Sequence, residues 1–230
     1  MERTAVVETL EGIAASFAAL AACVRTAAGE DGSEAAGAEP LSGDPLVAGD
    51  PLRDQADAYL DGLEELGRME APMAALKVHL AAGYAAAADA LAARARSAQE
   101  RRAHQMAVTA EVACALTVSE RTADALLGEA QTLTERLPLT LATLQAGNIS
   151  WQHARTLCDE TANLEPAAAA ALEAHFLDPD ARGAARGRLP GELVPGRFRA
   201  KVRAWRERHH PVSLEIRHRR SAKDRRVEYS

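Results

Sequence analysis

Apolar residues recur every three or four positions through most of this chain, a spacing that predicts α-helices. The first such stretch covers residues 2–27, where the steps between apolar residues alternate between four and three, as in a coiled-coil seam. This seam consists of Val6, Leu10, Ile13, Phe17, Leu20 and Val24. A seam of this length can support self-association or can pack on the rest of the chain, and we favour packing within the chain.

Residues 28–52 carry no such period and are rich in Gly, Pro, Asp and Glu, which predicts a flexible acidic linker. A second helix is expected from Arg53 to Leu66, ended by Gly67. Pro72 suits the first turn of a helix and is predicted to open a third, long one. The inner face of the second helix is predicted from Ala56, Tyr59, Leu60 and Leu63, and the third runs through Met73, Leu76, Leu80, Ala87 and Leu91.

The segment from Glu111 to Leu127 predicts a helix-turn-helix-like hairpin. Its first helix is expected over Val108 to Leu116, although the polar stretch 94–105 leaves the start of that helix open. Thr117 and Val118 form the turn, and Ser119 is a suitable N-cap for the helix that follows. Close packing of the two helices is assigned to Ala113, Leu116, Val118, Ala123 and Leu127, and the second helix is expected to bury Ala123, Leu126, Leu127, Ala130, Leu133 and Leu137.

Such a hairpin could read DNA or could be a purely structural helix pair. The positions that would face a groove are Glu120, Arg121, Asp124 and Ala125. Arg121 and Thr122 are the conventional contact types among the residues at this helix start, whereas two carboxylates would repel phosphates. The hairpin alone therefore gives weak support for direct base reading.

Proline, serine and glycine residues define the boundaries of the next helices. Pro138 opens a short helix with Leu141 and Leu144 inward, and Gly147 is expected to end it in the left-handed conformation. Ser150 caps a helix over residues 151–164 that buries Ala154, Leu157 and Cys158, and Pro166 opens another that runs to Leu177. His153 is interpreted as a structural polar residue, oriented by Asp159 or by a backbone carbonyl.

The C-terminal part of the chain is basic. Residues 178–196 read as a Gly/Pro/Arg-rich loop, and Pro195 opens a helix with Phe198, Val202 and Trp205 on one side. The remaining positions of that helix carry the other candidate nucleic-acid contacts, Arg197, Arg199, Lys201, Arg203, Arg206 and Arg208. A strand-like alternation begins at residues 226–229, which suggests a truncated gene product because a lone strand has no partner.

The predicted fold class is therefore all-α: a multi-helix bundle with a long N-terminal helix, the hairpin, and the start of a C-terminal strand. Four segments follow: an N-terminal amphipathic helix (1–27), the linker (28–52), a helical domain (53–180) and a basic segment (181–230).

The amino-acid composition predicts the cellular compartment and the kind of partner. The three cysteines, Cys23, Cys114 and Cys158, are isolated and odd in number, which favours reduced thiols in the cytoplasm over a disulfide or zinc framework. Neither a secretory signal nor a membrane-spanning run is expected. The net charge is −6, but the charges are unevenly distributed. Up to Ala92 there are sixteen acidic and five basic residues, whereas from Arg182 to Arg226 there are fifteen basic and four acidic residues. This asymmetry indicates a nucleic-acid or acidic partner for the C-terminal part, or a solvated Arg-rich helix face.

The residues from Glu111 to Leu164 resemble a known family. The elements that carry the resemblance are Leu137-Pro138, the short helix with Leu141 and Leu144, Gly147-Asn148-Ile149-Ser150, His153-Ala154-Arg155 and the turn from Ser119 to Ala123. Together they resemble the actinobacterial DUF222 proteins, also called the 13E12 repeat family. The likeness extends over roughly residues 52–229.

The resemblance implies association with an HNH endonuclease module, in which His and Asn residues bind a divalent cation that activates water. This chain has no such set: His209-His210 is followed by Pro211, and no downstream His-Asn-His order or Cys-x-x-Cys pair follows. No catalytic residue, metal ligand or cofactor is therefore assigned, and a divalent metal would enter only with the absent module.

Two functions remain open. One is a nucleic-acid-binding accessory domain of an HNH-type protein, which binds DNA through the basic residues named above. The alternative is a helical interaction or regulatory domain that does not bind DNA and that self-associates or meets a partner through its N-terminal half.

Overall fold

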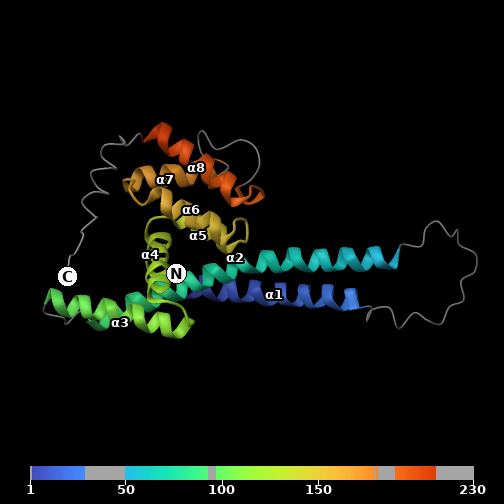
Figure 1. The fold of residues 1–230 in the computed structure, drawn as a ribbon, viewed down its shortest axis with the longest axis horizontal. Coiled ribbons are helices and arrows are strands. Elements are labelled where there is room, and N and C mark those ends of the chain that lie inside the picture. Colours follow the sequence, from blue (N-terminus) through green and yellow to red (C-terminus); the bar gives the residue numbers. More distant parts are fainter. Residues whose placement is uncertain (1, 29–49, 93–96, 179, 181–189, 211–230) are drawn as a thin grey trace, which may run out of the picture.

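The computed structural model describes residues 2–28, 50–92, 97–178, 180 and 190–210, and these residues form helices and connecting turns (Figure 1). The helices are α1 Glu2–Ala28, α2 Pro51–Ala92, α3 Ala98–Leu116, α4 Glu120–Glu135, α5 Pro138–Gln145, α6 Trp151–Thr161, α7 Pro166–Leu177, the 3₁₀ turn Pro190–Glu192, and α8 Pro195–His209. The all-α prediction is confirmed. The predicted strand start at 226–229 and residues 29–49 of the predicted linker lie outside the described residues.

The long antiparallel pair α1 and α2 projects from one end of the molecule, and the shorter helices gather at the other (Figure 1). Helix α4 runs from α3 to α5 and packs on α2, while α8 lies on α6 and α7. Most of the core is built where α2 meets α4 and α5, around side chains such as Val78, Leu133 and Leu144.

Helix α2 is continuous, so the two predicted helices over this region are wrong in their boundaries. Gly67 does not end a helix, and Pro72 lies in the interior instead of the first turn. Pro72 has no N–H to donate to the carbonyl of Arg68, four residues earlier. Packing along α1, where Gly62 lies against Leu20 and Cys23, outweighs that local cost.

The turn between α5 and α6 approaches this interruption in α2. A Cβ atom on Gly147 would lie 3.5 Å from the Arg68 carbonyl oxygen. Gly147 has a φ of 75°, which confirms the left-handed conformation predicted for it. A glycine is therefore favoured here both by its backbone angle and by the close approach to α2.

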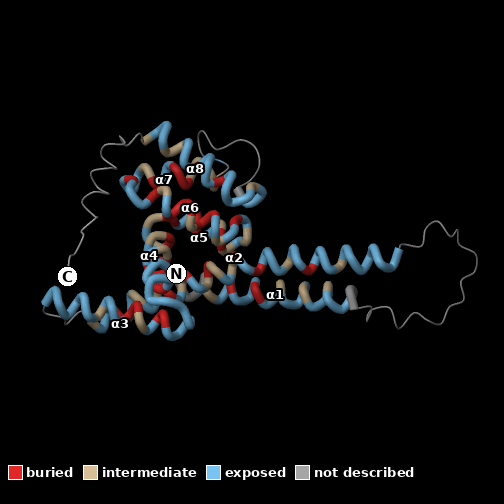
Figure 2. Tube along the Cα trace, viewed as in Figure 1, coloured by how far each residue is buried: buried red, intermediate tan, exposed pale blue. Residues whose placement is uncertain are grey.

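The predicted inner faces of the first two helices are largely wrong. In α2, Tyr59, Leu60 and Leu63 are exposed, as is Ala56. In α1 the predicted seam divides: Ile13 is buried and Val6 and Leu20 are half-buried, whereas Leu10, Phe17 and Val24 are exposed. The physical reason is that the projecting half of the hairpin has only two helices, so each covers one narrow side of the other (Figure 2).

Helix α1 is also more apolar than the sequence reading allowed. The segment Val6–Arg25 has a mean hydropathy of 1.5 and is long enough to cross a membrane by length and composition, and 11% of it is buried in the fold. A core helix or a signal sequence meets the same criterion, so the absence of a membrane-spanning segment stays a prediction.

The α3–α4 hairpin is confirmed, with a longer first helix than predicted. Helix α3 starts at Ala98, where Ser97 and Glu100 form a capping box. Ser119 caps α4 as predicted, because its Oγ accepts from the Thr122 N–H at 3.2 Å. The six inner positions expected of this second helix are all buried: Ala123, Leu126, Leu127, Ala130, Leu133 and Leu137. Of the predicted hairpin contacts, however, Leu116 and Val118 are exposed, since both lie at the open side of the turn.

Thr117 ends α3 in the left-handed conformation, with φ 54° and ψ 46°. A β-branched side chain is strained there by about 1–2 kcal/mol, because its Cβ crowds the backbone. We expect Thr117→Gly to raise the free energy of unfolding by about 1 kcal/mol, since glycine lacks that strain but adds freedom to the unfolded chain. Urea unfolding followed by circular dichroism measures this. A less stable Thr117→Gly variant would show that the strain at Thr117 is smaller than the entropy that glycine adds to the unfolded chain.

Helices α5, α6 and α7 begin at Pro138, Trp151 and Pro166, as their proline and serine signals predict. Helix α6 ends at Thr161, three residues before the predicted end. The residues expected to be buried in these helices are buried: Leu141, Leu144, Ala154, Leu157 and Cys158.

Candidate nucleic-acid interface

Helix α8 is anchored to the rest of the fold by two fully buried side chains, Phe198 and Val202. The Phe198 ring makes edge contacts with Phe176 of α7, at 5.6 Å between centroids, and with His153 of α6, at 5.0 Å. Trp205 is half-buried on the same side of α8. The predicted apolar side of this helix therefore lies against α6 and α7 (Figure 1).

His153 fixes the chain just before α8. Its Nε2 lies 2.8 Å from the carbonyl oxygen of Leu193, and its Nδ1 lies 2.7 Å from the Oγ of Ser150. The backbone N–H of Ser150 also donates to Nδ1, at 3.3 Å, so Nδ1 is an acceptor and Nε2–H is the donor to Leu193. Burial lowers the pKa of His153, although the bond to Leu193 opposes this. The ring is therefore neutral at pH 7 and holds α8 against α6, with the backbone carbonyl as its partner instead of Asp159.

The six basic residues of α8 divide into two flanks. Successive residues of an α-helix are turned by about 100°. Relative to the buried side, this places Arg199, Arg203 and Arg206 on one flank, and Arg197, Lys201 and Arg208 on the other. The two flanks have different electrostatic surroundings.

The first flank is neutralised by carboxylates. Arg199 forms an ion pair with Asp159 of α6 at 2.7 Å, and Arg206 pairs with Glu160 of α6. Arg203 pairs with Glu207, one turn along α8, at 3.0 Å. Arg199 and Arg206 therefore hold α8 on α6, and all three arginines carry little uncompensated charge.

The second flank consists of Arg197, Lys201 and Arg208, which we call the cationic stripe. All three side chains are exposed, and none has an ion pair with another residue in the described part of the chain. At 1.5 Å of rise per residue, their Cα atoms are spaced by about 6 Å and about 10 Å along the helix. The stripe therefore presents three adjacent positive charges along one exposed face.

The other two predicted contacts lie elsewhere. Arg121 and Thr122 are exposed at the start of α4, which adjoins α3, whereas α8 lies beyond the other end of α4 (Figure 1). The Thr122 hydroxyl lies 2.8 Å from the Oγ of Ser119 as part of the cap. Glu120 and Asp124 are exposed beside Arg121. The fold thus does not bring the hairpin candidates together with those of α8.

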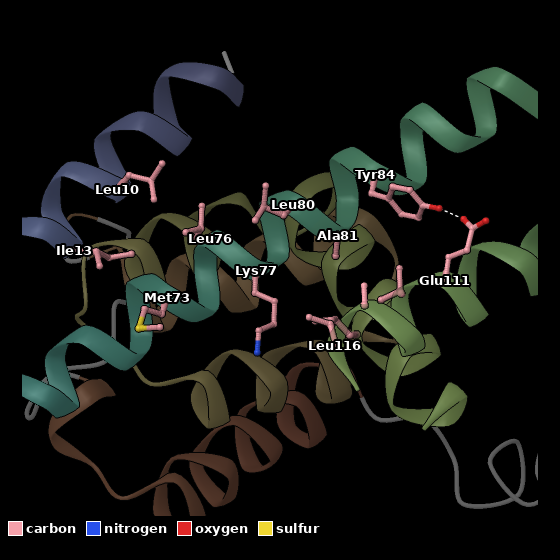
Figure 3. A pocket seen from close by; sticks show the side chains of 13 residues that line it. Leu10, Ile13, Met73, Leu76, Lys77, Leu80, Ala81, Tyr84, Glu111 and Leu116 are labelled. Atoms are coloured by element: carbon pink, nitrogen blue, oxygen red, sulfur yellow. Dashed lines mark hydrogen bonds between the residues drawn. The ribbon is translucent and has the colours of Figure 1, made fainter. Parts of the chain in front are cut away.

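A groove of about 610 Å³ opens on a different part of the surface, and no sequence motif predicted it (Figure 3). Most of its wall is apolar, from side chains such as Leu10 of α1, Met73 and Leu80 of α2, and Leu116 of α3. Its polar side chains are Lys77, Tyr84 and Glu111, and the Tyr84 hydroxyl donates to the Glu111 carboxylate. That bond raises the pKa of Tyr84. Such a wall suits an apolar partner better than a reaction.

No cluster of three side chains suited to hold a metal ion occurs among residues 2–28, 50–92, 97–178, 180 and 190–210. The buried thiol of Cys158 has its pKa raised to about 12, mainly by burial. It is consequently a protonated core side chain and a poor nucleophile.

These features define an all-helical domain with an anchored basic helix at one end and a long hairpin at the other. A family model described as "Domain of unknown function (DUF222)" matches residues 71–230, and the chain belongs to that family. No curated protein and no solved structure matches the chain. The match begins within α2, so α1 and the first half of α2 lie outside it.

Proposed function

We propose that this chain is a nucleic-acid-binding helical domain that serves an HNH-type nuclease module, with the cationic stripe as its phosphate contact. The observation that carries the proposal is the difference between the two flanks of α8. The stripe offers charges that no carboxylate in the described structure neutralises, whereas Arg199, Arg203 and Arg206 are engaged with acids.

Phosphate binding requires uncompensated positive charge, because affinity arises largely from the release of counterions. The net charge of the chain is −6, so only a local surface can attract DNA. The stripe lies on α8, which packs on α6 and α7, whereas the acid-rich first half of α2 belongs to the projecting hairpin (Figure 1). The nuclease association itself rests on the family resemblance, and no catalytic role is proposed for this chain.

The experiment compares two triple variants by fluorescence anisotropy with labelled duplex and single-stranded DNA at low salt. We expect Arg197→Gln with Lys201→Gln and Arg208→Gln to abolish most binding. The salt dependence, as log K against log salt, should become shallower by about 2–3 for duplex DNA, because up to three phosphate contacts are lost.

The control variant removes the same number of charges from the other flank: Arg199→Gln, Arg203→Gln and Arg206→Gln. It should retain most of the DNA affinity while losing stability, because Asp159 and Glu160 would lose their partners. Equal loss of binding in both variants would mean that general charge, and not the stripe, attracts DNA. Undetectable binding by the wild-type chain would reject the proposal.

A helical interaction domain is the second candidate. It is favoured by a separate observation, the exposed apolar residues on one face of the α1–α2 hairpin.

A further inference from the structure

The exposed apolar residues of the α1–α2 hairpin form one continuous surface. We define this apolar strip by Leu10, Phe17 and Val24 of α1 and by Leu66, Met73 and Leu80 of α2, all exposed by 44–60%. Leu10, Met73 and Leu80 line the same groove, which places the two rows on one face of the hairpin (Figure 3).

The antiparallel register of the two helices keeps the rows side by side along the hairpin. Leu20 of α1 lies opposite Gly62 of α2, since a Cβ atom on Gly62 would be 3.7 Å from the Leu20 side chain. Moving along both helices from that contact brings Phe17 level with Leu66, and Leu10 level with Met73. The strip therefore extends from the α3 end of the hairpin far into its projecting half.

The spacing of the strip indicates that its partner is a helix pair. Both rows repeat every seven residues, at 10, 17 and 24 in α1 and at 66, 73 and 80 in α2. A separate set of residues, including Ile13 of α1 and Met69 of α2, is already buried within the fold. Helices of four-helix bundles carry one apolar surface toward each neighbour, so this hairpin has the form of half a bundle.

The size of the strip is that of a stable interface. With Tyr59 and Leu63, which extend it along α2, the exposed surface of these residues is about 800 Å², taking roughly 200 Å² for each fully exposed residue. Monomeric proteins rarely expose a contiguous apolar patch above roughly 600 Å², whereas a standard interface covers about 800 Å² per partner. A surface of this extent is expected to be covered in solution.

The charges on the hairpin favour a second copy over a basic partner. Glu70 and Lys77 flank the α2 row of the strip; they are exposed, lie seven residues apart, and have no ion pair with another described residue. In a two-fold arrangement, Glu70 of one copy can face Lys77 of the other, and Lys77 of the first can face Glu70 of the second. The acids Asp57, Asp61 and Glu64 lie on the side of α2 turned away from the strip, where two copies would not oppose them.

We propose that two copies of this chain associate through the apolar strip, so that their α1–α2 hairpins complete a four-helix bundle. The proposal does not depend on nucleic-acid binding, because α8 packs on α6 and α7 and contributes no residue to the strip. The strip differs from the predicted seam of α1. Val6, Ile13 and Leu20 of that seam are covered within the chain, whereas the strip combines the exposed residues of α1 with an exposed row of α2.

The test is sedimentation velocity of the full chain over a concentration series. The wild-type chain should be a dimer, and Leu66→Gln with Met73→Gln should raise the dimer dissociation constant by about 100-fold or more, because each change removes buried apolar area twice. The matched control is Leu60→Gln, which alters an exposed leucine of α2 outside the strip and should leave the dimer unchanged. Circular dichroism verifies that every variant stays helical.

A charge exchange tests the two-fold arrangement. Glu70→Lys alone should weaken the dimer, and adding Lys77→Glu should restore it. The proposal is overturned by a wild-type chain that is monomeric at about 100 µM, a concentration at which a micromolar dimer would be nearly complete. It is also overturned if strip variants dimerise as the wild type does. A monomeric chain that binds phosphatidylcholine vesicles would show that the strip contacts lipid. A monomeric chain that the strip variants destabilise would show that other residues of the same chain cover the strip. Either result rejects the dimer.

Discussion

Phe198→Ala is expected to lower the free energy of unfolding by about 3–5 kcal/mol, the usual cost of removing a fully buried aromatic ring. The ring has no exposed surface and contacts both Phe176 and His153. Its loss leaves a cavity at the junction of three helices. Because α8 has only one other fully buried side chain, Val202, we also expect the backbone amides of α8 to exchange hydrogen much faster than those of α4.

Urea unfolding measures the global effect of Phe198→Ala, and hydrogen exchange by mass spectrometry measures the local one. Leu60→Ala serves as the control, since Leu60 is 65% exposed and its truncation creates no cavity. A loss below about 1 kcal/mol for Phe198→Ala would mean that α8 is not packed as the structure has it.

Glu173→Leu is expected to cost about 3 kcal/mol, because it leaves two buried donors without an acceptor. One carboxylate oxygen of Glu173, in α7, accepts from the backbone N–H of Thr140 at 2.6 Å and from its hydroxyl at 2.8 Å. Helix α5 has no cap of its own, since its N-cap residue is Leu137. The carboxylate of α7 thus caps α5 from across the core. Thermal and urea unfolding of Glu173→Leu measure the loss, and a variant as stable as the wild type would contradict this role.

Glu173→Gln separates the hydrogen bonds from the charge. Burial raises the pKa of Glu173, while the bonds from Thr140 oppose the shift. A raised pKa means that the folded state holds the proton more tightly than the unfolded state, so the contribution of Glu173 to stability falls as pH rises above about 4.5. Gln keeps an acceptor and does not titrate. The stability of Glu173→Gln relative to the wild type should therefore increase from pH 4.5 upward, and a constant difference would show that Glu173 titrates normally.

Local signals predicted the short helices well. These signals act only on neighbouring residues of the chain, so the sequence alone is enough to predict the helix ends. They are proline at 138, 166 and 195, Ser119 as a cap, and Gly147 in the left-handed conformation. The same logic failed for Gly67 and Pro72, because packing along α1 keeps α2 continuous through both. The ends of a helix are determined by residues close in sequence, whereas the continuity of a long helix depends on the helices that pack against it.

The candidate interface was predictable in its composition but not in its electrostatics. The sequence placed six basic residues on one helix, yet the ion pair between Arg199 and Asp159 joins residues forty positions apart. Only the fold shows which flank faces the carboxylates of α6. For the same reason, the inner face assigned to Tyr59, Leu60 and Leu63 was wrong, since periodicity identifies an apolar face without showing what covers it.

The most direct test of the proposed nucleic-acid interface is the salt dependence of duplex DNA binding by the wild-type chain, measured by fluorescence anisotropy from low to physiological salt. Three phosphate contacts by Arg197, Lys201 and Arg208 predict a slope of log K against log salt of about −3. A slope near zero, or no binding at the lowest salt, would contradict the assignment of the stripe to phosphate contacts.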